Sequence, residues 1–95
     1  MKKRTKLQLV KLLRKTLKER GTKTGLCWLI YKLFEDSRVT DKEYGILCNI
    51  IQSTPKEVIK AGGYPNNAYY WEPGQIPPRL TYLNLLVKRY SPKTT

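Results

Sequence analysis

The chain has 95 residues, and its formal net charge of +12 comes from 19 basic and 7 acidic residues. This length predicts one domain, residues 1–95, with a modest core that oligomerisation would help to complete. Histidine and a Cys-x-x-Cys pair are both absent from the sequence, which argues against a metal site and against acid–base catalysis near neutral pH. We therefore expect a protein that is not an enzyme and that needs no cofactor or metal.

The positive charge is concentrated at the start of the sequence. Residues 1–23 hold ten basic side chains and one acid, which is +9 of the net +12. Such a field attracts nucleic acids, nucleotides and other anions. No apolar signal-peptide core follows the first lysines, and every uncharged run is far shorter than the roughly 20 residues of a membrane span. We expect a soluble, intracellular protein without a membrane partner.

The first helix is expected between Thr5, which can cap its start, and about Arg20. Gly21 follows the last residue of the pattern, as expected for a left-handed C-terminal cap. The apolar side of this helix is a stripe formed by Leu9, Val10, Leu13 and Leu17. The opposite side carries the basic residues Lys11, Arg14, Lys15 and Lys18. This side is interpreted either as a contact surface for nucleic acid or another anion, or as the solvated face of a core-packed helix.

A second helix is expected over about 25–36, with Thr24 as its N-cap. Apolar residues cover it almost all round, which predicts the central and most buried helix of the domain. Its first turn, from Gly25 to Cys27, offers free backbone N–H groups to an anion; the alternative is a glycine chosen for close contact between helices. Cys27 and Cys48 lie within apolar patterns, which predicts two buried free thiols rather than a disulfide framework.

Capping signals place three further helices. Thr40 and Glu43 form a capping box, and each of the last two helices begins with a proline, which suits the first helical position. The expected ranges are Thr40 to about Ser53, then 55–61 with Thr54 as its cap, and finally 78–90; the tails 1–4 and 91–95 are expected to fray. The last helix should bury the stripe Leu80, Leu83, Val87 and Tyr90. The sequence therefore predicts an all-α domain, a compact bundle of four to five helices.

Residues 62–79 hold four aromatic residues, four of the six prolines and three of the six glycines. The prolines oppose a helix, and the aromatic content is too high for a solvated linker. We expect an ordered loop that closes the bundle, with a short hairpin at 69–71 as an alternative. Tyr69, Tyr70 and Trp71 offer flat faces for stacking on nucleobases, and Arg79 offers a forked donor for phosphate. The loop is either such a pocket or a hydrophobic plug over the helix ends.

Four short motifs follow one another along the chain: Gly25-Leu26-Cys27, Thr40-x-x-Glu43, Tyr70-Trp71-x-Pro73-Gly74, and Pro78-Arg79 followed by Leu83. Together, over about residues 24–87, they resemble a group of small bacteriophage accessory proteins with a Gly-Leu/Ile-Cys helix start and a C-terminal Trp-x-Pro-Gly…Pro-Arg element. The resemblance implies a phage origin, no known catalysis and a role in countering host defence. The positions shared with the group are Gly25, Cys27, Trp71, Gly74 and Arg79, which implies one cluster, either a pocket or a folding staple.

Three functional hypotheses follow. The first is a non-enzymatic phage protein of the host cytoplasm that sequesters an anionic nucleotide, such as a cyclic-nucleotide immune signal. Its ligand site would consist of Gly25, Cys27, Trp28, Tyr69, Tyr70, Trp71 and Arg79. The second is nucleic-acid binding by the first helix, through Lys11, Arg14, Lys15 and Lys18. The third is an inhibitor that binds a host defence protein through exposed tyrosine and tryptophan side chains.

Overall fold

The computed structural model describes residues 4–21, 24–61 and 78–92. Within these ranges the elements are helices and no strand is present. They are α1 (Lys6–Arg20), α2 (Leu26–Glu35), α3 (Asp41–Gln52), α4 (Lys56–Lys60) and α5 (Pro78–Tyr90). The predicted all-α bundle is confirmed. The aromatic loop expected to close it, with the alternative hairpin at 69–71, lies outside the described residues.

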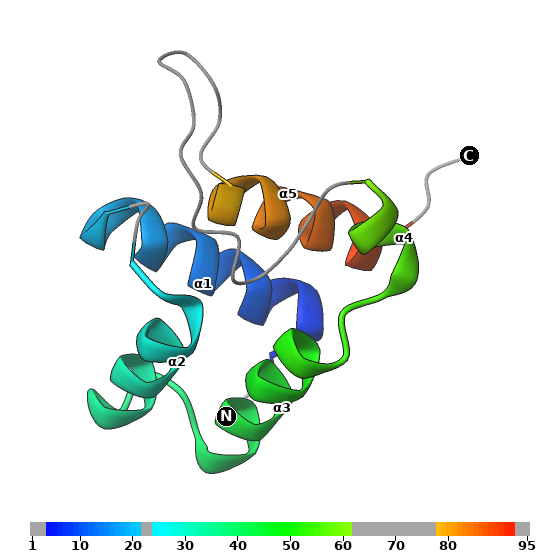
Figure 1. Cartoon of the computed structure of the whole chain (residues 1–95). Coiled ribbons are helices and arrows are strands. Elements are labelled where there is room, and N and C mark those ends of the chain that lie inside the picture. The colour runs from blue at the N-terminus through cyan, green and yellow to red at the C-terminus, as the bar shows by residue number, and fades with distance from the viewer. Residues whose placement is uncertain (1–3, 22–23, 62–77, 93–95) are drawn as a thin grey trace.

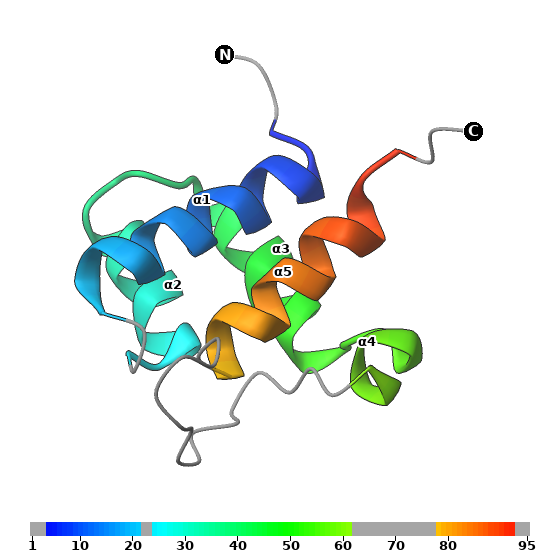
Figure 2. The ribbon, with the colours of Figure 1, turned by 90° about the horizontal axis from the view of Figure 1, so that it is seen from above.

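The helices are arranged in two levels around α1. Helices α1 and α5 lie side by side and run in opposite directions, as the two views show (Figures 1 and 2), and α2 and α3 lie below α1. Helix α1 packs against α5, α2 and α3, whereas α4 packs against α5. The core is formed where these helices meet, and α1 is its central element.

Helix α1 begins as the sequence predicts, but Gly21 does not form the predicted left-handed cap at its end. Thr5 caps the first turn, because its side chain accepts from the Gln8 backbone N–H and the Gln8 side chain accepts from the Thr5 N–H. Gly21 ends the helix with φ 115° and ψ 134°, and its N–H donates to the Leu17 carbonyl over 2.9 Å. The positive φ favours glycine here, although the ψ value differs from that of a left-handed helical cap. The predicted apolar stripe is buried in full: Leu9, Val10, Leu13 and Leu17.

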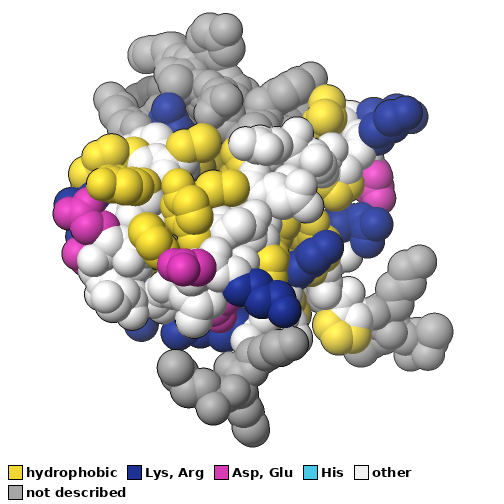
Figure 3. All heavy atoms as spheres, turned by 90° about the horizontal axis from the view of Figure 1, so that it is seen from below, with side chains coloured by type: hydrophobic (Ala, Val, Ile, Leu, Met, Phe, Trp, Pro, Cys, Tyr) yellow, Lys and Arg dark blue, Asp and Glu magenta, His cyan; other side chains and the backbone are white. Residues whose placement is uncertain are grey.

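The prediction that the second helix is the most buried is wrong. One side of α2 packs into the core through Leu26, Leu29, Ile30 and Leu33. The other side is solvent-exposed, and hydrophobic side chains gather on the lower face of the molecule (Figure 3). Helix α2 packs mainly against α1 and α3, and on its outer side Trp28, Tyr31 and Phe34 stay 37–50% exposed. Cys27, expected to be buried, is exposed, and Cys48 is half-buried; both are free thiols.

The start of α2 also differs from the prediction. Gly25, not Thr24, is the N-cap residue, and it provides no side-chain cap for the first turn. A Cβ atom added at Gly25 would meet nothing within 4 Å. The interpretation of this glycine as a requirement of close helix packing is therefore wrong.

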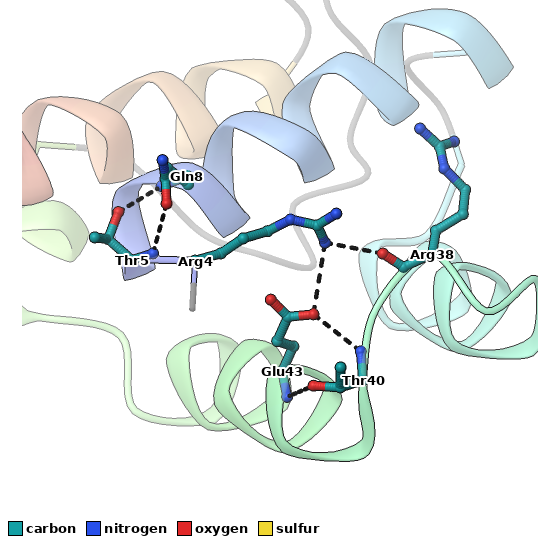
Figure 4. Close-up of polar contacts among 6 residues, drawn as sticks. All are labelled: Arg4, Thr5, Gln8, Arg38, Thr40 and Glu43. Atoms are coloured by element: carbon teal, nitrogen blue, oxygen red, sulfur yellow. Dashed lines mark hydrogen bonds and ion pairs between the residues drawn. The ribbon is translucent and has the colours of Figure 1, made fainter. Parts of the chain in front are cut away.

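The start of α3 is tied to the start of α1 (Figure 4). Thr40 and Glu43 form the predicted capping box, with distances of 2.9 and 3.1 Å between their side-chain oxygens and backbone nitrogens. Arg4, expected in a frayed tail, donates from Nη1 to the Arg38 carbonyl over 2.8 Å and lies 3.5 Å from the Glu43 carboxylate. The Arg4 guanidinium thus joins the first residues of α1 to the loop and cap that precede α3.

We predict that Thr40→Ala lowers the free energy of unfolding by about 1 kcal/mol, because the Glu43 N–H loses its side-chain acceptor. Urea denaturation measures this change. Lys42→Ala is the matched control, since Lys42 lies in the same turn and its side chain is exposed. Equal stability of the two variants would show that the cap contributes nothing.

Tyr82 joins α5 to the segment between α3 and α4. The Thr54 hydroxyl donates to the Ile51 carbonyl over 3.0 Å, so the Tyr82 hydroxyl, 2.9 Å away, donates to Thr54. The sequence suggested that Thr54 caps α4, but this prediction is wrong. Helix α4 begins at Lys56 rather than at Pro55. Tyr82 is fully buried, which the predicted stripe of α5 missed. Burial raises the pKa of Tyr82.

Candidate nucleic-acid interface on the outer face of α1

The outer face of α1 holds a cluster of cations. Residues 11, 14, 15 and 18 share one side of a helix because they lie three, four and seven positions apart. An open surface concavity of about 340 Å³ is lined by Lys11, Arg14, Lys15, Lys18 and Glu19. The structure thus brings together all four residues that the sequence predicted as anion contacts. We call these four residues the basic face; their binding of an anion stays a prediction.

Arg14 is the member of the basic face that a neighbouring helix holds by a hydrogen bond. Its side chain is half-buried, and its Nη1 donates to Asn84 Oδ1 on α5 over 3.0 Å. A guanidinium has five N–H donors, and the others have no hydrogen-bond partner among the described residues. Asn84 therefore holds the fork in place while leaving donors for a ligand. Sequence reasoning missed Asn84; its only signal is an amide between Leu83 and Leu85 in an otherwise apolar stretch.

Several cations of the described chain have acidic partners, whereas the four residues of the basic face, like Lys42, Lys56 and Lys60, have none. Four ion pairs occur within the described residues, at N–O distances of 2.8 to 3.6 Å: Arg4–Glu43, Arg20–Asp36, Lys32–Glu35 and Arg89–Glu57. Lys6 lies over the Tyr90 ring, 5.9 Å from its centroid. No residue of the basic face forms an ion pair within the described chain, although Glu19 lines the same concavity. Uncompensated positive charge is therefore concentrated on α1.

The other predicted site is described only in part. Arg79 lies in the first turn of α5 and is partly exposed; its Nε is buried and has no hydrogen-bond partner among the described residues. Gly25, Cys27 and Trp28 lie together at the start of α2. No contact seen in the described chain joins them to Arg79, and Tyr69, Tyr70, Trp71 and Gly74 fall outside it. A single ligand site formed by the start of α2 and the aromatic loop therefore stays a prediction.

Trp28 is occupied by neighbours of its own. The Arg20 guanidinium carbon and the Lys32 Nζ each lie 5.6 Å from the centroid of its ring. Such cation–π contacts stabilise an exposed indole and reduce the ring surface that is open to a nucleobase. The indole is therefore better placed for a contact at its exposed edge than for stacking within a pocket.

The described residues were also compared with the requirements of a metal site and of a membrane span. No group of three or more potential metal ligands occurs among residues 4–21, 24–61 and 78–92. None of the helices found there combines the length and the apolar character of a membrane span. Comparisons with protein-family models, with curated proteins and with solved structures found no match.

Proposed function

We propose that this protein is a non-enzymatic nucleic-acid-binding protein that holds the phosphate backbone against the basic face of α1. The observation that carries this proposal is a concavity lined by four cations and a single acid, Glu19, in which none of the four cations forms an ion pair within the described chain. Lys11 and Lys18 are separated by about 10 Å along the axis, at 1.5 Å per residue. One strand of a DNA duplex carries one charge per about 3.4 Å of the duplex axis, so a backbone segment of about 10 Å has a phosphate for each of the four residues.

The chemistry of the basic face favours binding without sequence recognition. Lysines are flexible point charges, and an arginine fork matches a phosphate in two hydrogen bonds. Phosphate contacts position a protein on DNA but carry no sequence information directly. We therefore expect similar affinities for unrelated duplexes, with Kd of about 10⁻⁴–10⁻⁶ M at physiological salt.

Fluorescence anisotropy with an end-labelled duplex of mixed sequence tests this function. Four phosphate contacts predict that the logarithm of the binding constant falls with the logarithm of salt concentration at a slope of about −3.6, or 0.9 per contact. A second duplex of different sequence should give the same curve. Absence of binding at low salt, or a slope near zero, would overturn the proposal.

Asn84 provides a more specific prediction. Asn84→Ala releases the Arg14 guanidinium but leaves its charge in place. We expect the affinity for the duplex to fall about 2- to 10-fold, because binding must then order this side chain, while the salt slope stays unchanged. Asn49→Ala, at an exposed position of α3, is the control. A changed slope, or an equal loss in both variants, would contradict a positioning role for Asn84.

A second candidate function is capture of an anionic nucleotide at Arg79. The observation that favours it is the buried Arg79 Nε without a partner among the described residues, since buried polar groups are nearly always paired. Calorimetry against cyclic dinucleotides, cyclic trinucleotides and ADP-ribose derivatives is the test. We expect binding that Arg79→Gln abolishes without lowering the melting temperature. No heat with any of these compounds would eliminate this candidate.

The biological setting of the proposal rests on the resemblance to small phage accessory proteins. Within that setting we propose an action in the host cytoplasm, where a backbone-binding protein would reach host or phage nucleic acid and counter a defence system. A direct inhibitor of a host defence protein is the remaining alternative. The test is to express the protein in a bacterium that carries defined defence systems and to challenge this strain with phage. A counter-defence role predicts more phage growth than in the same strain without the protein.

A further inference from the structure

The exposed side of α2 carries a row of aromatic side chains. Trp28 is 48%, Tyr31 50% and Phe34 37% exposed, although they occupy one ten-residue helix. The Phe34 ring packs against the half-buried Tyr44 of α3, with ring centroids 4.9 Å apart. We call Trp28, Tyr31 and Phe34 the aromatic face. Hydrophobic side chains gather on the lower side of the molecule (Figure 3), the side on which α2 and α3 lie (Figure 1).

The size of the aromatic face reaches the lower end of the range found for the largest apolar patches of monomers. An aromatic side chain buries about 150–250 Å² in a core, so these three leave about 200–340 Å² of aromatic surface exposed. The largest apolar patches on typical monomers measure about 300–600 Å² and are often functional. Together with Tyr44, the aromatic face is large enough to form the apolar centre of a small interface. Polar residues around it would supply the remaining interface area.

The charges around the aromatic face compensate one another. Arg20 and Lys32 lie over Trp28, and each has its own acidic partner: Asp36 at 3.6 Å and Glu35 at 3.5 Å. An acidic partner protein would therefore find no unpaired cation here. Two copies of this surface related by a two-fold axis would each bring both signs of charge, which allows opposite charges to meet across the axis.

The remaining positive charge lies elsewhere on the molecule. The buried stripe of α1 faces α2 and α3, so the basic face, which Arg14 joins to α5, lies on a side away from α2 and α3. Two copies can thus approach through α2 while their basic faces stay apart. We propose that the aromatic face is the interface of a two-fold homodimer, with a second copy of this chain as its occupant.

Sedimentation velocity over micromolar to submillimolar protein concentrations tests the dimer. The average mass should rise from that of the monomer towards twice that value. Added salt should strengthen the association, because it screens the repulsion between two chains of net charge +12. Nucleic-acid binding weakens with salt, so the two proposals respond in opposite directions and can fail independently. A wild-type protein that stays monomeric at every concentration would overturn the dimer.

Tyr31→Glu locates the interface, because it places two carboxylates near the two-fold axis. Ile59→Glu is the matched control: Ile59 is an exposed hydrophobic residue on α4, 36% accessible, and the change in charge is the same. We expect at least a tenfold weaker dimer for Tyr31→Glu and no change for Ile59→Glu, with equal helix content by circular dichroism. Trp28→Gln, which adds no charge, is the second variant if Tyr31→Glu fails to fold. A folded variant of the aromatic face that dimerises like wild type, or an equal loss in Ile59→Glu, would contradict this interface.

Discussion

Replacing Lys11, Lys15 and Lys18 together by glutamine is expected to lower the affinity for duplex DNA by about 100-fold near physiological salt. Each phosphate contact releases counterions, so three lost contacts change the salt slope from about −3.6 to about −0.9. The three side chains are exposed and glutamine is a good helix former, so the melting temperature should change little. Fluorescence anisotropy across a salt series measures both the affinity and the slope.

A second triple variant removes the same charge from another part of the chain. Lys42, Lys56 and Lys60 are exposed on α3 and α4, and we replace each by glutamine as well. If net charge alone attracts DNA, the two triple variants will lose affinity equally. The proposed interface requires the α1 variant to lose at least ten times more affinity than this control.

Tyr82→Ala is expected to lower the free energy of unfolding by about 3–5 kcal/mol, the usual cost of removing a fully buried aromatic ring. Domains of this size are stable by about 5–15 kcal/mol, so the variant should unfold at a much lower urea concentration or fail to fold. Tyr82→Phe keeps the ring and removes only the hydrogen bond to Thr54, which should cost about 1 kcal/mol.

Urea denaturation of both Tyr82 variants separates packing from hydrogen bonding. A Tyr82→Phe variant as unstable as Tyr82→Ala would place the whole contribution in the hydroxyl. A Tyr82→Ala variant within 1 kcal/mol of wild type would contradict the central position of this ring between α5 and the segment that precedes α4.

Local signals explain which parts of the fold the sequence predicts well. The capping boxes at Thr5 and Thr40 use residues three positions apart, so they act before any tertiary contact forms. The basic face is similarly local, because helical spacing alone places its four residues on one side of α1. Both could therefore be predicted from periodicity and capping chemistry.

Features that depend on contacts between helices could not be predicted in this way. Trp28 and Tyr31 are as apolar as core residues, and only the positions of α1 and α3 leave them exposed. The stripe assigned to α5 missed Tyr82, because the side of a helix that meets the core depends on the helices packed against it. Asn84 acquires its role only through Arg14, 70 positions earlier in the chain.

The most direct test of the proposed function is a map of the surface that DNA contacts. Two-dimensional NMR of the isotope-labelled protein, titrated with a short duplex, reports this for every backbone amide. We expect the largest shifts at residues 11–19 of α1 and at Asn84, with little change at Lys42, Lys56 and Lys60. Large shifts confined to α3 and α4, with residues 11–19 unchanged, would contradict the assignment of the basic face as the nucleic-acid interface.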